Sequence, residues 1–259
     1  MTRLLTSIAA SLILGVAALG VGAANAQESF TKLTVGADPH YRPISFVDDT
    51  GKLVGFDVEF AEELGKHMGI PVDYQGMAWD GIIPALQSKK IDAITNIVIT
   101  EERKKVVAFS QPIMKQTIVG VISASAEKKD VTAADLPTMK VGVMVNTSAA
   151  SAIAALGGIE PTTYNTVVDA YNDLLLGRID IVAVESVNGG YIVSSQYPDK
   201  LLVVDKPLTA DVKLNGVALR QSDTAGLAQI DEAITKMKQD GTLAAIATKW
   251  LGGTSGLPD

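Results

Sequence analysis

Apolar, β-branched runs alternate with helix-like patterns between residues 33 and 204. Short runs of this kind are typical of buried strands, and strands that alternate with helices are typical of a mainly parallel sheet covered by helices. The sequence therefore predicts an α/β protein. Its expected strands are residues 32–37, 72–74, 91–96, 117–124, 140–145, 180–184, 201–205 and 215–220.

The expected helices are marked by capping residues and by apolar stripes. In residues 57–68, Asp57 is expected at the N-cap, Phe60, Leu64 and Met68 share one face, and Gly69 follows the last turn. His67 is expected to act as a cation at the C-terminus of this helix. Further helices are expected over residues 80–87, 147–156, 166–176, 223–238 and 242–250.

The pattern of strands and helices restarts after residue 124, which indicates two lobes. The first series has too few elements for a complete domain, and the last strand and its two helices have no sheet of their own. We therefore predict one lobe from residues 27–115 and 213–259, and a second lobe from residues 116–212. The chain would cross between the lobes near residues 113–116 and 210–213, which makes a hinge beside a cleft.

The first 26 residues have the pattern of an export signal. Arg3 is followed by a mostly apolar stretch, and Ala24 and Ala26 flank Asn25 as a small-x-small cleavage site. We expect removal of residues 1–26 and a soluble periplasmic protein. An uncleaved membrane anchor is the alternative, because an apolar stretch of roughly 20 residues can span a bilayer.

The composition and the absence of known motifs exclude several classes of function. The formal net charge of −7 argues against nucleic acid or an anionic membrane as partner, and the absence of Cys excludes disulfides and thiol catalysis. No dinucleotide-binding, phosphate-loop or nucleophile-elbow motif is present, and His40 and His67 lack the spacing of metal ligands. We predict no cofactor, no metal and no catalytic residue.

Arg103 is the first candidate binding residue. Thr100 is expected to cap a helix whose first turn contains Arg103, where a cation opposes the helix dipole. Either the guanidinium holds a ligand carboxylate through two parallel hydrogen bonds, or it is solvated and pairs with Glu101 or Glu102.

Further candidates follow the ends of expected strands. Thr147 and Ser148 open a helix whose first N–H groups either attract an anion or are simply capped. Glu185 lies at the C-terminal end of a strand, where it either pairs with an ammonium group or is a surface residue. Tyr41 and Trp79 each either line the floor of a site or pack in the core.

Nine ordered motifs resemble the periplasmic polar amino-acid-binding proteins of ABC importers, the family 3 extracellular solute-binding proteins, over residues 33–251. They are residues 55–58, 79–86, 91–93, 99–103, 109–110, 141–143, 177–180, 216–220 and 240–242. The resemblance implies the type II periplasmic binding protein fold, in which two α/β lobes joined by two hinge strands close on a ligand. It also implies a monomeric, non-enzymatic receptor that presents an amino acid to a membrane permease.

The resemblance further implies roles for individual residues. Arg103 matches the carboxylate-binding arginine, Ser148 the hydroxyl at a helix terminus, and Glu185 the acid that holds the ammonium group. The remaining matches are the aromatic walls Tyr41 and Trp79, the acidic position Asp38 that can reach a ligand's distal group, and the backbone stretch of Thr95 and Asn96.

Two departures concern the end of the site that would hold the amine. Val98 stands where the family usually has Ser or Thr, and Glu185 is one methylene longer than the common Asp. The expected ligand is therefore a polar amino acid or an amino-acid-like compound with a carboxylate and an amine, such as a modified amino acid or an opine-like conjugate. Two alternatives are a dehydratase of cyclic carboxylates on the same fold, with Glu185 as general acid, and a soluble sensor partner of a membrane receptor.

Overall fold

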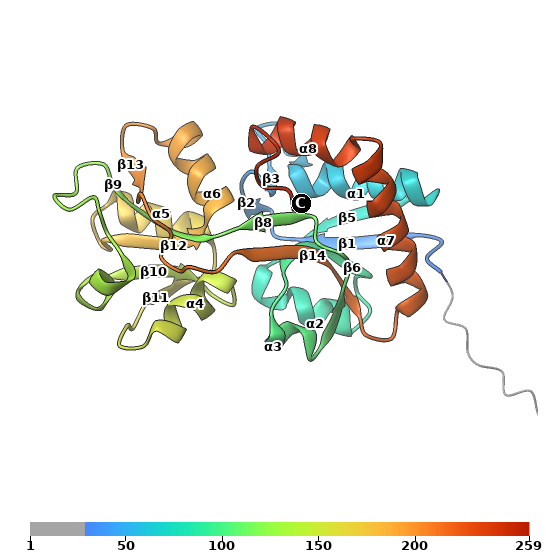
Figure 1. Ribbon diagram of the computed structural model, residues 1–259, viewed down its shortest axis with the longest axis horizontal. Coiled ribbons are helices and arrows are strands. Elements are labelled where there is room, and N and C mark those ends of the chain that lie inside the picture. Colours follow the sequence, from blue (N-terminus) through green and yellow to red (C-terminus); the bar gives the residue numbers. More distant parts are fainter. Residues whose placement is uncertain (1–28, 259) are drawn as a thin grey trace, which may run out of the picture.

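The computed structural model describes residues 29–258, which form two lobes placed side by side (Figure 1). The expected signal segment, residues 1–26, lies outside the described residues. No helix within residues 29–258 is both long and apolar enough to cross a membrane. Each lobe is built around its own mixed sheet, so the predicted two-lobed α/β fold is confirmed.

The sheet of the first lobe contains a late strand of the chain. Its order is β5 (Val72–Gly76), β1 (Leu33–Ala37), β6 (Ala93–Val98), β14 (Lys213–Arg220) and β7 (Val107–Phe109), with β8 (Met114–Gln116) also paired to β14. β1 pairs in parallel with β5 and β6, whereas β14 runs antiparallel to its partners. The sheet is therefore more mixed than the expected, mainly parallel one.

The sheet of the second lobe has the order β11 (Thr162–Tyr164), β10 (Val141–Met144), β12 (Ile181–Glu185), β9 (Ile118–Ser123) and β13 (Leu201–Val203). β10 and β12 are parallel, and β9 is antiparallel to β12 and β13. β9 comes directly after the chain crosses from the first lobe, and it therefore runs in the direction opposite to β12 and β13.

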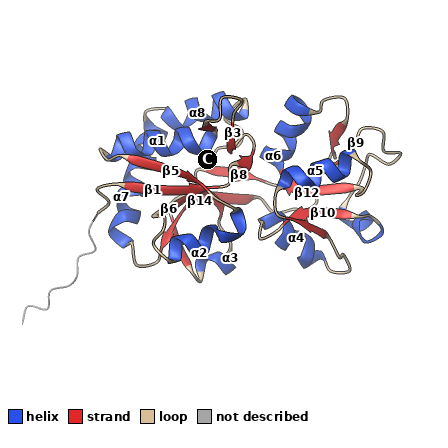
Figure 2. Cartoon of the chain, turned by 180° about the vertical axis from the view of Figure 1, so that it is seen from behind, coloured by secondary structure: helices blue, strands red, loops and turns tan. Residues whose placement is uncertain are grey.

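Helices cover both faces of the first sheet (Figure 2). One face is covered by α1 (Phe56–Met68), α7 (Thr224–Gln239) and α8 (Thr242–Leu251), the other by α2 (Ile82–Gln87), which the 3-10 turn Trp79–Gly81 precedes. Val217 and Leu219 of β14 face the three long helices, and Ala218 between them faces α2. This alternation is what a strand buried on both faces requires. The short α3 (Glu101–Lys104) follows β6.

The second lobe is layered in the same way. α4 (Ser148–Leu156) packs on one face of its sheet, while α5 (Val167–Leu175), α6 (Ser186–Tyr191) and the π-helical segment Ile192–Gln196 cover the other. The 3-10 segment Ala133–Thr138 lies on the α4 side. Ile181 and Ala183 of β12 face α4, and Val182 and Val184 face α5.

Two strands connect the lobes. β8 and β14 run together between the lobes in Figure 1 and pair antiparallel, with Gln116 opposite Lys213. Gln116 also donates from Nε2 to Oδ1 of Asn215 at 3.1 Å, and both side chains are buried. The chain therefore passes between the lobes at the two places where the sequence predicts crossings. The domain boundaries themselves remain a prediction.

The start of α1 corrects one expectation. The helix begins at Phe56 with Gly55 as its N-cap, so Asp57 is inside the first turn and is not the cap. Gly55 has φ of 131°, and a Cβ there would lie 2.4 Å from the carbonyl oxygen of Ile44, so only glycine fits. Pro43 and Ile44 lie in the turn between the first two strands of a small three-stranded sheet, which the sequence analysis did not predict. Its strands are β2 (His40–Tyr41), β3 (Ser45–Val47) and β4 (Leu53–Val54).

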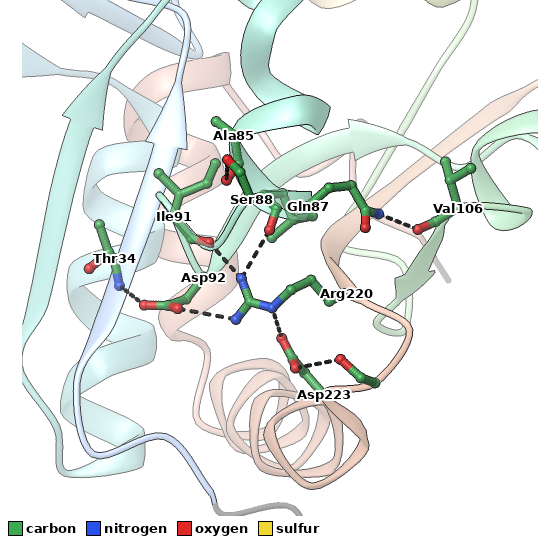
Figure 3. Close-up of polar contacts among 11 residues, drawn as sticks. Thr34, Ala85, Gln87, Ser88, Ile91, Asp92, Val106, Arg220 and Asp223 are labelled. Carbon is green, nitrogen blue, oxygen red and sulfur yellow. Dashed lines mark hydrogen bonds and ion pairs between the residues drawn. The ribbon is translucent and has the colours of Figure 1, made fainter.

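A buried arginine fastens β14 to its surroundings (Figure 3). Nη1 of Arg220 donates to the carbonyl oxygens of Leu86 at 3.1 Å and Ile91 at 2.7 Å. Its Nη2 lies 3.2 Å from Asp92, and its Nε lies 2.7 Å from Asp223. The guanidinium thus links β14, the last strand in the chain, to α2 and to the loop between α2 and β6.

His67 ties the end of α1 to the end of α7. Its Nδ1 lies 2.7 Å from the carbonyl oxygen of Glu63, and its Nε2 lies 2.8 Å from Asp240. Both ring nitrogens face acceptors, an arrangement that favours the imidazolium. The bond to Asp240 therefore raises the pKa of His67, and it contributes to lowering the pKa of Asp240 to about 2.

This pair predicts a pH-dependent contribution to stability. The folded-state pKa of His67 lies above its usual value of 6.5, so the contribution is complete below that pH and is lost as pH rises through the folded-state pKa. We expect His67→Gln to lower the free energy of unfolding more at about pH 5.5 than at about pH 8.5. Urea unfolding of both proteins at the two pH values measures this. An equal difference at both values would contradict it.

Candidate functional site

A cavity between the lobes is lined by all ten residues singled out from the sequence. It contains about 560 Å³ of space free of atoms, its open mouth included. The ten are Asp38, Tyr41, Trp79, Thr95, Asn96, Val98, Arg103, Thr147, Ser148 and Glu185. The chain therefore brings these residues to one place from both lobes, and a role in ligand binding remains a proposal.

Arg103 projects from α3 towards the second lobe. Thr100 caps this helix as expected, accepting from the backbone N–H of Arg103 at 3.1 Å. The guanidinium donates from Nη1 to the carbonyl oxygen of Val98 and from Nη2 to that of Asn146, both at 2.9 Å. Burial lowers the pKa of Arg103, whereas the nearby charge of Glu185 raises it. A guanidinium has five N–H donors, so these two carbonyls leave donors for a ligand.

Glu185 is the last residue of β12 and is 5% exposed, so the interpretation as a surface residue is wrong. Its Oε1 accepts from the hydroxyl of Ser148 at 2.5 Å and from the N–H of Ala149 at 3.3 Å. Its Oε2 accepts from the hydroxyl of Tyr41 at 2.5 Å. The longer side chain of Glu thus reaches both the first turn of α4 and the opposite lobe.

The first turn of α4 is capped by a side chain and also lies beside an anion, so both interpretations of this helix start apply. Thr147 is the N-cap, and its hydroxyl oxygen accepts from the N–H of Ala150 at 3.1 Å. The N–H of Ala149 points to Glu185, so the anion next to this helix terminus is a side chain of the protein itself. A carboxylate in this position is stabilised by the positive end of the helix dipole.

The two aromatic residues connect the lobes. The hydroxyl of Tyr41 donates to Glu185, and burial together with that carboxyl raises the pKa of Tyr41 well above its usual value. The indole Nε1 of Trp79 donates to the carbonyl oxygen of Asn146 at 3.1 Å, and the guanidinium of Arg103 lies 5.7 Å from the Trp79 ring. Both rings pack against apolar residues of the second lobe.

Two acids of the first lobe line the cavity. Asp38 is 5% exposed, and its Oδ1 faces the backbone N–H of His40 at 2.9 Å and the ring Nδ1 of His40 at 3.1 Å. Burial raises the pKa of Asp38, and the contacts with His40 oppose that shift. Asp57 is completely surrounded, so burial raises its pKa to about 8. The Oδ2 of Asp57 accepts from the hydroxyl of Thr95 at 3.1 Å.

The end of β6 supplies backbone groups to the cavity. Asn96 has a positive φ of 55°, and its carbonyl oxygen accepts from Nδ2 of Asn215 at 2.8 Å. Val98 is buried, and its carbonyl oxygen is one of the two acceptors of Arg103. Its side chain gives this part of the cavity an apolar wall.

Sequence reasoning missed seven residues that also line the cavity. They are Ala37, Ile44, Ser45, Asp57, Gln116, Met144 and Asn215. Asp57 is part of a motif that the analysis singled out, but it was interpreted as a helix cap. Gln116 and Asn215 lie where the two lobes are joined, so only the topology reveals that they face the cavity.

Residues 33–253 match the family described as bacterial extracellular solute-binding proteins, family 3. The chain belongs to this family. The L-cystine-binding protein TcyJ of Escherichia coli strain K12 is 36% identical over 85% of this chain and 82% of its own length. The histidine-binding periplasmic protein of Salmonella typhimurium is 31% identical over 85% of this chain and 87% of its own length.

A solved structure agrees with these relatives. An ancestral arginine-binding protein bound to arginine has a TM-score of 0.80 and is 31% identical, covering 87% of this chain and 100% of that chain. The three proteins are named for the amino acids they bind and not for a reaction. Together with the family match, these relatives identify a polar amino-acid-binding protein of an ABC transport system, and the relatives named here are binding proteins, not enzymes.

Proposed function

We propose that this protein captures one polar amino acid between its lobes in the periplasm and delivers it to the membrane permease of an ABC transporter. The observation that carries the proposal is the cavity itself. It places the guanidinium of Arg103 and the carboxyls of Asp38 and Glu185 around one space bounded by both lobes.

The cationic part of the cavity suits a carboxylate. Arg103 is held by the carbonyls of Val98 and Asn146, which fix the plane of the guanidinium without neutralising its charge. Its remaining N–H donors can hold a carboxylate through charge-assisted bonds inside a partly desolvated cleft. A ligand carboxylate would offset the cost of burying this cation.

The acidic part suits cationic or N–H-bearing groups. Glu185 would bind the α-ammonium group, and Asp38 would meet a polar group at the far end of the side chain. The relatives bind cystine, histidine and arginine, whose side chains all carry polar atoms well beyond the β-carbon. We infer that the ligand belongs to the same class of long, polar amino acids.

A thermal-unfolding screen tests the proposal. The panel contains L-arginine, L-histidine, L-cystine, L-leucine and agmatine, which is arginine without its carboxylate. At 100 times its dissociation constant, a ligand adds about 2.7 kcal/mol to stability. We expect a clear rise in the unfolding temperature with at least one of the three polar amino acids, and none with L-leucine or agmatine. No rise with any L-amino acid, or an equal rise with agmatine, would contradict the proposal.

Export and transport complete the proposed role. Residues 1–26 would direct the chain to the periplasm, where relatives such as the histidine-binding protein act. Delivery to a permease is inferred from the family. Uptake of the labelled ligand by cells that lack the protein distinguishes import from the sensor alternative, since import predicts loss of uptake.

A further inference from the structure

Asn188 of α6 is completely buried where the two lobes meet. Its Nδ2 donates to the carbonyl oxygen of Arg42 in the first lobe at 2.6 Å. Its Oδ1 accepts from the hydroxyl of Tyr171, on α5 of its own lobe, at 2.8 Å. One side-chain amide is therefore oriented by the second lobe and bonded to the first.

Apolar side chains interlock around this bond. Tyr41, next to Arg42, packs against the core of the second lobe, and Val187, next to Asn188, packs against the core of the first. Each lobe thus inserts one side chain into the apolar surface of the other. Moving the lobes apart would expose both side chains and would break the Asn188 bond.

The Asn188 bond differs from the other contacts described between the lobes. Tyr41, Trp79 and Arg103 each donate across the interface, and all three line the cavity. Among the described residues that line the cavity, neither Asn188 nor Arg42 is found. A change at Asn188 can therefore alter how firmly the lobes close without removing a group that faces the ligand.

We propose that Asn188 is a closure latch that sets the affinity for every ligand by stabilising the closed arrangement of the lobes. The inference rests on the proposed function in that binding is coupled to closure. The apparent dissociation constant equals the intrinsic one divided by the fraction of molecules that are in the closed, binding-competent state. Loss of one net hydrogen bond should raise it about fivefold, equally for all ligands.

Two variants test the latch. Asn188→Ala removes the amide, and Asn188→Asp keeps an acceptor for Tyr171 while it places a carboxyl oxygen against the carbonyl of Arg42. We expect the dissociation constant measured by calorimetry to rise about fivefold for Ala and further for Asp. The ratio between two ligands, for example L-arginine and L-cystine, should stay constant. If Asn188→Ala does not fold, Asn188→Asp carries the same test.

Tyr171→Phe is the matched control. It removes the bond within the second lobe and keeps the bond between the lobes, so its dissociation constant should change by less than about twofold. An effect as large as that of Asn188→Ala would overturn the proposal, because the cause would then be damage within the second lobe. Unchanged affinity in both Asn188 variants, or a loss confined to one ligand, would overturn it as well.

A measurement without ligand tests the role of Asn188 in closure independently of the proposed function. The chain has no Cys, so Asp49→Cys and Lys129→Cys, at exposed positions of opposite lobes, can carry spin labels cleanly. We expect Asn188→Asp to shift the distance between the labels towards longer values than in the protein with Asn188. An unchanged distribution would overturn the latch, whether or not any amino acid binds.

Discussion

Replacing Arg103 with alanine is expected to weaken binding of the amino acid by at least about 2 kcal/mol, roughly a thirtyfold rise in the dissociation constant. The guanidinium is positioned by Val98 and Asn146, which belong to different lobes, so the variant loses both a carboxylate partner and a contact that supports closure. Calorimetry with the ligand found in the thermal screen measures the change.

Two variants assign the cause of this loss. Lys104→Ala removes the neighbouring cation on α3, whose Nζ lies 2.7 Å from Glu101, and should bind the ligand normally. Arg103→Lys keeps the charge but not the planar pair of donors, and should recover only part of the affinity. Unchanged affinity in Arg103→Ala would show that this residue does not hold the carboxylate.

Replacing Arg220 with methionine is expected to lower the free energy of unfolding by about 3–5 kcal/mol. The substitution keeps the apolar stem but leaves Asp92, Asp223 and the carbonyls of Leu86 and Ile91 without their shared partner (Figure 3). At the usual scaling for a chain of this size, the unfolding temperature falls by roughly 6–20 °C. Urea and thermal unfolding of the unliganded protein measure both quantities.

Arg178 provides the control for this prediction. Its Nη1 lies 2.9 Å from Asp173, a similar distance, but 67% of its side chain is exposed. Arg178→Met should therefore change stability by less than about 1 kcal/mol. Equal effects of the Arg178 and Arg220 variants would show that burial does not decide the strength of these pairs. Ligand affinity of folded Arg220→Met should remain close to that of the original protein, because Arg220 is not among the described residues that line the cavity.

The parts that the sequence predicted well depend on local chemistry. Thr100 caps α3 as expected, and Thr147 caps α4, which is one of the two interpretations of that helix start, because a β-hydroxyl placed before a helix can accept from its first turn. Glu185 lies at the C-terminal end of a buried strand, so its place at the cavity follows from the general behaviour of α/β sheets. These features need no knowledge of distant contacts.

The parts that the sequence did not predict depend on contacts between distant segments. Asp57 looks like a helix cap, but the helix begins earlier because Gly55 allows the backbone to approach Ile44. Asn188 lies in a segment for which the sequence analysis predicts no element, and its partner Arg42 is 146 positions away. No periodicity or propensity marks such a bond, so its importance emerges only when the two lobes are placed together.

The most direct test is a crystal structure of the protein with the amino acid that stabilises it most. We predict that the ligand carboxylate lies within hydrogen-bonding distance of the Arg103 guanidinium and that the ligand ammonium group lies beside Glu185. The ligand side chain is expected to point to Asp38. A ligand bound outside this cavity, or an Arg103 guanidinium that points to solvent in the complex, would contradict the account.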